Sequence, residues 1–174
     1  GARTTESQTH REMASGLSMP VGFKNATDGN IQVAINAIES ASIPHSFLGI
    51  DQEGHTAVVT TAGNPNTHLV LRGGDKQPNF EIPEVTYAAC KLEAAGLEPS
   101  LMVDCSHANA GKVARNQVRV WKDILKQRAR GKSPVTGAMV ESFLEEGTQK
   151  ISGDLQYGLS ITDPCIDWET TENM

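Results

Sequence analysis

Cysteine, positive charge and long apolar runs are all scarce in this 174-residue chain. No apolar run approaches the roughly 18 residues of a membrane span, so we expect no membrane partner. The 3 cysteines, Cys90, Cys105 and Cys165, form no CxxC pair, which argues against a disulfide framework and favours a reducing, cytoplasmic compartment. The chain has 15 Lys and Arg but 21 Asp and Glu, so its net charge is negative and we expect no nucleic-acid partner. Any bound anion must therefore be held by a few cationic side chains at specific positions.

Short apolar runs alternate with amphipathic stretches along the chain. This alternation predicts an α/β fold with a parallel sheet covered by helices. The opening Thr5 to Gln8 resembles a capping box for a first helix, which Gly16 would close as a C′ glycine. We expect strands at 20–25, 68–72, 101–104 and 135–140, later helices at 31–43, 83–96 and 113–125, and an inserted hairpin of 46–50 with 56–61.

Four chemically versatile residues each fall at the C-terminal end of a predicted strand. They are Lys24, Arg72, His107 and Glu141. In α/β proteins the carboxyl ends of parallel strands form the edge at which sites are built. The same placement on four strands therefore predicts one shared site.

Three cations could hold an anionic ligand at that edge. Arg3 directly precedes the first helix, so its guanidinium and the free N–H groups of the first turn could bind one phosphate. Lys24 and Arg72 would face the same region, which suits a ligand with both phosphate and carboxylate groups. Alternatively, Arg3 is a surface residue and Arg72 pairs with a nearby acid.

His107, Glu141 and Asp163 are side-chain types that bind divalent metals. A mixed nitrogen and oxygen set suits Mn, Fe, Co or Zn, and an open position would admit a substrate carbonyl. A hydrogen-bonded buried histidine is the alternative for His107, and we expect Cys105 to pack in the core. From the residues alone we expect a phosphate-binding α/β enzyme, and its dependence on a metal stays open at this point.

Six motifs in order resemble the type I 3-deoxy-D-arabino-heptulosonate 7-phosphate (DAHP) synthases, which open the shikimate pathway. They are GARTTESQ at 1–8, PVGFKN at 20–25, LRGG at 71–74, DCSHAN at 104–109, MVES at 139–142 and SITD at 160–163. The resemblance implies a (β/α)8 (TIM) barrel, which needs roughly 250 residues. We therefore expect residues 1–174 to be about its C-terminal half, strands 5 to 8 with their helices plus an inserted hairpin, truncated at both ends and inactive alone.

The resemblance also implies roles for individual residues. The backbone at Ala2, with Arg3 and Arg72, would bind the phosphate of phosphoenolpyruvate, and Lys24 its carboxylate. His107, Glu141 and Asp163 would bind the divalent metal, with Lys24 and His107 as catalytic residues in the condensation with erythrose 4-phosphate. The family's fourth metal ligand, a cysteine near the first barrel strand, and the Arg/Lys motif of the second strand have no counterpart here.

Regulation and assembly are implied by the same resemblance. We expect a homo-oligomer that needs the N-terminal half-barrel and is inhibited by an aromatic amino acid. Ser18, Phe47 and Val59 resemble residues of the effector pocket, although packing would explain them equally well. Which aromatic amino acid inhibits stays open.

Two other functions compete with this one. The first is the sister synthase, 3-deoxy-octulosonate 8-phosphate synthase, which condenses phosphoenolpyruvate with arabinose 5-phosphate. The second is a non-catalytic half-barrel that binds phosphate compounds without metal dependence. The opening Gly-Ala-Arg-Thr-Thr motif and the inserted hairpin favour the DAHP synthase.

Overall fold

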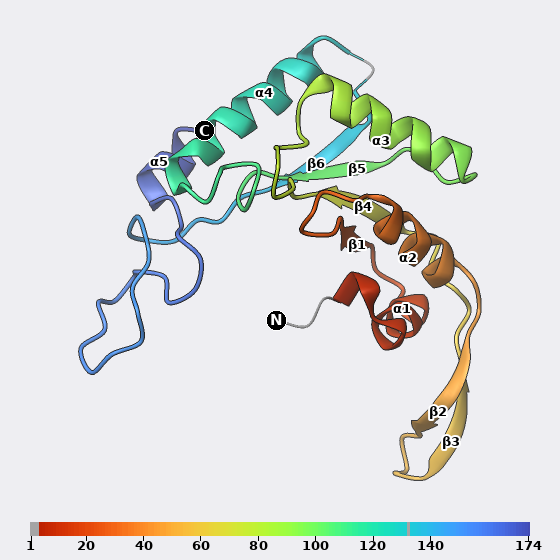
Figure 1. Ribbon diagram of the computed structural model, residues 1–174. Helices are drawn as coiled ribbons and strands as arrows, with labels where there is room; N and C mark the ends of the chain where they lie inside the picture. Colours follow the sequence, from red (N-terminus) through yellow and green to blue (C-terminus); the bar gives the residue numbers. More distant parts are fainter. Residues whose placement is uncertain (1–3, 132) are drawn as a thin grey trace.

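The computed structural model describes residues 4–131 and 133–174. Helices pack along one side of a sheet, while a hairpin and a long loop project away from it (Figure 1). The helices are η1 (Thr4–Glu6), α1 (Gln8–Ser15), α2 (Gln32–Ser42), α3 (Ile82–Ala94), η2 (Ala114–Asn116), α4 (Gln117–Ala129) and α5 (Trp168–Glu172). The strands are β1 (Val21–Lys24), β2 (Ser46–Ile50), β3 (Thr56–Thr60), β4 (Thr67–Leu71), β5 (Leu101–Asp104) and β6 (Val135–Met139). None of the described helices is both long and apolar enough to cross a membrane.

The main sheet is parallel and open. Its strands lie in the order β1-β4-β5-β6, and β2 and β3 form a separate antiparallel hairpin. Helices α2, α3 and α4 each lie in the chain between two strands of the main sheet. The predicted α/β class, the four parallel strands and the inserted hairpin are therefore confirmed, while the sheet is not closed into a barrel.

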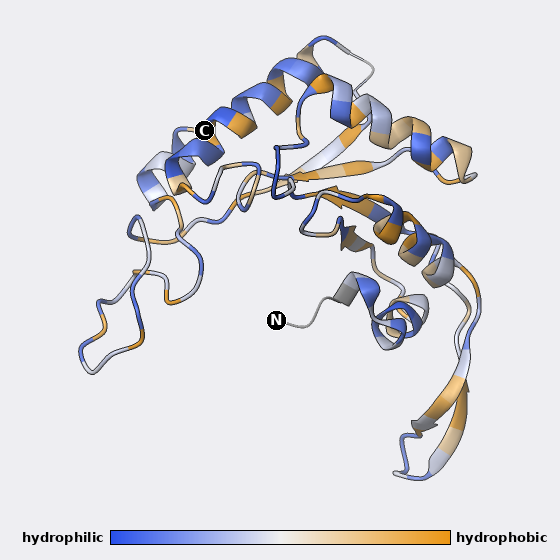
Figure 2. Ribbon diagram, in the orientation of Figure 1, coloured by the Kyte–Doolittle hydropathy of each residue, from blue (hydrophilic) through white to orange (hydrophobic). Residues whose placement is uncertain are grey.

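One face of the sheet forms the core with the helices. Strand register places Phe23, Leu69, Leu101 and Val135 in a row, and each is at most 4% exposed. Figure 2 shows apolar residues along β4 and β5 and an alternation of apolar and polar residues along α4. Fully burying such a side chain contributes about 1.5–3 kcal/mol. The helical partners in this core are Ala34, Ile35, Ile38, Val85, Ala88, Leu92, Val120 and Ile124.

The opposite face of the sheet is only partly covered by the described residues. Lys24, Val70, Met102 and Gly137 form a row on this face. Gly22 lies on this face, two residues before Lys24. A Cβ at position 22 would lie 2.6 Å from Val70 Cγ2, so only glycine leaves room for the Val70 side chain beside β1. The C-terminal end of this face therefore carries a lysine over an otherwise apolar row.

The predicted start of the first helix is wrong, whereas its predicted end is confirmed. Its N-cap is Ser7, whose hydroxyl, within the described residues, contacts His10 Nδ1 at 2.9 Å and does not cap the helix. Thr5 Oγ1 donates to the Lys24 carbonyl at 2.9 Å, so a contact with β1 takes the place of the expected capping box. At the other end, α1 stops at Ser15 and Gly16 closes it as expected, although Gly16 is the C-cap, with φ −95°, and not the residue after the cap.

Candidate active site at the carboxyl edge of the sheet

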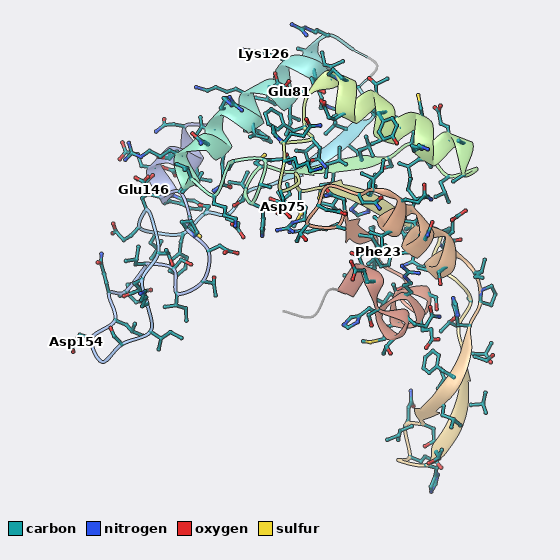
Figure 3. All side chains as sticks on the ribbon, viewed as in Figure 1. Phe23, Asp75, Glu81, Lys126, Glu146 and Asp154 are labelled. Carbon is teal, nitrogen blue, oxygen red and sulfur yellow. The ribbon has the colours of Figure 1, made fainter. Side chains whose placement is uncertain are left out.

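The predicted site residues gather at the C-terminal edge of the sheet. Lys24 ends β1, and Arg72, His107 and Glu141 follow β4, β5 and β6 within three residues. A cavity of about 430 Å³ lies at this edge, and Arg72, His107, Glu141 and Asp163 all line it. Figure 3 labels Asp75, another lining residue, where the strand ends meet.

Three of these side chains form a cluster of metal-ligand type. His107 Nε2 lies 3.9 Å from Glu141 Oε1 and 3.7 Å from Asp163 Oδ2, and one donor atom from each residue lies within 4.8 Å of the others. Metal bonds of about 2.0–2.2 Å place two ligand atoms of one ion roughly 3–4 Å apart. The cluster therefore fits a divalent ion of the Mn, Fe, Co or Zn type after small movements.

Asp163 reaches the cluster from the long loop between β6 and α5. The loop folds back on itself through isolated bridges, which pair Ser142 with Ile166 and Gly147 with Cys165. The Asp163 side chain is 64% exposed, compared with 21% for that of His107. One ligand is therefore held on a loop, whereas the other two follow strands directly.

His107 has an unusual backbone conformation. Its φ is +47°, in the left-handed region that a residue with a Cβ occupies at a cost of about 1–3 kcal/mol. The Lys112 N–H donates to the His107 carbonyl at 2.9 Å and closes the turn after β5. Backbone strain of this kind is typical of functional sites, where the surrounding structure holds it in place.

Asp104 was not predicted as a site residue, yet it joins two that were. Its Oδ2 lies 2.7 Å from Lys24 Nζ and 2.9 Å from His107 Nδ1. Asp104 Oδ2 and His107 Nδ1 are within ion-pair distance, but their angle is not that of a hydrogen bond, and Nδ1 has no other hydrogen-bond partner among the described residues. Burial would raise the pKa of this carboxyl, but the contacts with His107 and Lys24 outweigh burial, and the pKa is lowered. The sequence feature that could have indicated Asp104 is its position three residues before His107, the candidate ligand.

Glu141 is held from two directions. Ser106 Oγ donates to Glu141 Oε2 at 2.5 Å. Gln117, which is fully buried, accepts from the Glu141 N–H at 2.8 Å and donates to the Glu141 carbonyl at 3.1 Å. The backbone of Glu141 is therefore anchored to the start of α4, so its carboxylate has little freedom.

Asparagine side chains join the loops that carry the site. Asn25, which is 3% exposed, accepts from the Arg72 N–H at 2.8 Å and from Asn79 Nδ2 at 3.1 Å. Asn109 accepts from the Asn79 N–H at 2.8 Å and donates to the carbonyls of Leu71 and Asp104. These bonds connect the ends of β1, β4 and β5, which carry Lys24, Arg72 and His107.

The cations of the site differ in their surroundings. Arg72 and Lys112 both line the cavity, and within the described part of the chain Arg72 forms no ion pair with an acid. Lys24 is not among the lining residues and instead pairs with Asp104. Ala2 and Arg3 lie outside the described residues, so their phosphate contacts stay predictions.

The chain is similar to known proteins over its whole length. A family model described as the DAHP synthetase I family matches residues 1–174. The chain belongs to this family. It is 52% identical over 175 residues to the Tyr-sensitive phospho-2-dehydro-3-deoxyheptonate aldolase of Escherichia coli, and the match covers 99% of this chain and 49% of that protein.

Further members of the DAHP synthetase I family are similarly close. The Phe-sensitive aldolase of Escherichia coli is 53% identical, with 99% of this chain and 49% of the relative covered. The solved structure of the corresponding aldolase from Francisella tularensis matches with a TM-score of 0.93 and 46% identity, over 99% of this chain and 51% of the other. The chain therefore spans about half the length of these relatives.

A second cavity, of about 500 Å³, lies between the end of α1 and the β3-β4 connection. Ser18 and Val59, two of the three predicted effector residues, line it. Phe47 is not among its lining residues, but it pairs with Val59 across the hairpin. The structure thus brings the three residues near one cavity, and their role in binding an effector stays a prediction.

Proposed function

We propose that this chain supplies strands 5 to 8 of the (β/α)8 barrel of a DAHP synthase, the enzyme that condenses phosphoenolpyruvate with erythrose 4-phosphate. The products are DAHP and phosphate, at the first step of the shikimate pathway. The observation that carries this proposal is the convergence of Arg72, His107, Glu141 and Asp163 on one cavity at the carboxyl edge of a parallel sheet. Membership of the DAHP synthetase I family supports it.

The cations would bind the anionic groups of the substrates. Arg72 and Lys112, both at the cavity, would hold a phosphate, and Arg3 with the Ala2 backbone would add to this site. Lys24 would hold the carboxylate of phosphoenolpyruvate. In the reaction, C3 of phosphoenolpyruvate attacks the aldehyde carbon of erythrose 4-phosphate, water adds at C2, and phosphate leaves. Arginine beside the phosphate would stabilise the charge that this group carries as it leaves.

His107, Glu141 and Asp163 would hold the divalent metal, because their donor atoms already face one another. When bound, such an ion supplies Lewis acidity to a carbonyl oxygen. The residues around the cluster have the task of keeping these three side chains oriented. Which of Mn, Fe, Co and Zn is used is open, since the donor set suits all four.

Regulation and assembly form a further part of the proposal. The cavity lined by Ser18 and Val59 would take an aromatic amino acid, in keeping with the Tyr-sensitive and Phe-sensitive names of two relatives. The hairpin exposes Leu48, Ile50 and Val58 by 70% or more, and we propose that it contacts another copy in a homo-oligomer. The cytoplasmic location expected from the sequence stays a prediction.

The test uses the complete enzyme, with this chain and the other half-barrel together. Phosphoenolpyruvate is mixed with erythrose 4-phosphate or with arabinose 5-phosphate, and released phosphate and sugar product are measured. We expect product with erythrose 4-phosphate alone, loss of activity on chelation and recovery on adding Mn²⁺ or Zn²⁺. Arg72→Ala should lower kcat/KM by about 100-fold or more, which is the usual cost of losing a charge-stabilising group.

Arg130→Ala is the matched control, because Arg130 is an exposed arginine just after α4. It should leave kcat/KM within about twofold of the parent, as surface substitutions usually do. Product from arabinose 5-phosphate only would instead identify the sister synthase. Phosphate-ligand binding that survives chelation, without any product, would identify a non-catalytic half-barrel.

A further inference from the structure

Asp104 is the most strongly enclosed charged group at the site. It is 1% exposed at the end of β5, and both its carboxylate oxygens are engaged. Oδ1 accepts from the Ser106 N–H at 2.9 Å, whereas Oδ2 lies between Lys24 Nζ at 2.7 Å and His107 Nδ1 at 2.9 Å. One oxygen atom therefore connects the proposed substrate lysine with a proposed metal ligand.

We propose that Asp104 is a positioning residue that holds His107 with its proton on Nδ1 and fixes Lys24 beside it. This inference rests on the proposed function. In it, Asp104 touches neither substrate nor metal and acts through His107 and Lys24. Asp104 would set the tautomer of the His107 ring and the position of the Lys24 ammonium group.

The tautomer follows from what a carboxylate can do. An ionised carboxylate only accepts hydrogen bonds, so the ring nitrogen 2.9 Å away must carry a hydrogen or face lone-pair repulsion. With the proton on Nδ1, the Nε2 lone pair is free and faces Glu141 and Asp163. A carboxylate behind a ligand histidine is a common device for orienting the ring and raising its basicity.

The geometry of the sheet explains how Lys24 reaches the same atom. Lys24 and Asp104 lie on the same face of the sheet, on β1 and β5, with β4 between them. The lysine side chain must therefore extend across β4, and the ion pair holds it in that extended position. Its side chain is 35% exposed, so it stays accessible to an anionic ligand while it is anchored.

The test is Asp104→Asn, which keeps the shape and removes the charge. The new amide can still accept from Ser106 with its oxygen, and its NH2 group then faces Lys24 and His107. His107 would have to accept at Nδ1 and carry its proton on Nε2, where the lone pair for the metal was. In the complete enzyme we expect Zn²⁺ affinity, measured by competition with a chelating dye, to fall by about 10–100-fold.

Nitrogen NMR of the histidine rings supplies a readout that a merely structural role would not move. The metal-free parent enzyme should show His107 with its proton on Nδ1, and Asp104→Asn should show it on Nε2. Lys24→Met should leave the tautomer and the Zn²⁺ affinity within about twofold of the parent, because the carboxylate behind His107 is intact. Its affinity for phosphoenolpyruvate should fall.

Asp154→Asn is the matched control, since Asp154 is exposed at the far end of the loop after β6 (Figure 3). It makes the same change of charge and should change neither readout. The inference is wrong if Asp104→Asn binds Zn²⁺ within twofold of the parent with an unchanged tautomer. If Asp104→Asn does not fold, a His107 ring without a proton on Nδ1 in the parent would overturn the inference by itself. A parent enzyme without a metal site would contradict the proposed function, and the tautomer measurement would still decide the role of Asp104.

Discussion

At the scale of the residue, burial decides which cysteine can react. Cys105 lies between two site residues in sequence, yet it is 0% exposed and belongs to the core. Burial, with a further contribution from the Asp104 charge, raises the pKa of its thiol to about 12. The prediction that Cys105 packs in the core is therefore confirmed.

Thiol labelling tests this difference. At pH 8 a thiol with a pKa of about 12 is ionised at roughly one part in 10⁴, and the thiolate is the reacting species. We expect iodoacetamide to label exposed Cys90 readily, Cys165 slowly because burial raises its pKa, and Cys105 only after unfolding. Peptide mass mapping of the folded protein gives the measurement. Complete labelling of Cys105 before that of Cys90 would contradict the structure.

At the scale of the element, the turn after β4 depends on a glycine. Gly73 has φ +78°, and a Cβ there would lie 2.6 Å from the Asn109 backbone nitrogen. The close approach brings the turn after β4 against the turn after β5. Within the segment between β4 and α3, the Gly73 N–H also donates to Asn79 Oδ1 at 2.7 Å. Any side chain at this position would push apart the turns after β4 and β5, which carry Arg72 and His107.

Gly73→Ala should therefore destabilise the protein by two separate effects. The left-handed backbone costs a residue with a Cβ about 1–2 kcal/mol, and the overlap with the β5 turn adds about 1–3 kcal/mol. Gly96→Ala is a matched control, since Gly96 has φ +73° but a methyl group there would meet no atom of the described residues within 4 Å. Urea unfolding of both variants gives the free energies of unfolding. Equal losses in the two variants would show that the close approach at Gly73 costs nothing.

The elements also show what sequence can and cannot predict. Strands and helices follow from apolar periodicity, and the shared edge follows from the strand ends, so Arg72, His107 and Glu141 could be grouped in advance. The contacts of Asp104 could not, because that with Lys24 depends on the strand order β1-β4-β5 and that with His107 on the left-handed turn at His107. The start of α1 was predicted wrongly because Thr5 bonds to β1, a tertiary contact that no local motif encodes.

At the scale of the whole molecule, the sheet has two open edges. Among the described residues, β1 pairs only with β4 and β6 only with β5. The face with Lys24 and Met102 also has exposed positions, such as Met139 at 39% exposure. Open strand edges and uncovered apolar surface are features that proteins usually hide. In the proposed barrel, four further strands would pair with both edges and cover this face.

Separate expression of the two halves tests that arrangement. We expect the 174-residue chain alone to form DAHP at least about 100-fold more slowly than the complete enzyme, because half of the substrate contacts would be missing and misplacement by 1 Å already costs about that much. Adding the N-terminal half-barrel as a separate chain should restore activity and shift the mass in solution to that of the paired halves. Asp163→Asn in the 174-residue half should abolish this recovery without preventing pairing, since the Asp163 side chain is 64% exposed and belongs to no strand of the sheet. Full activity from the 174-residue chain as a monomer would show that this open sheet already contains a complete active site.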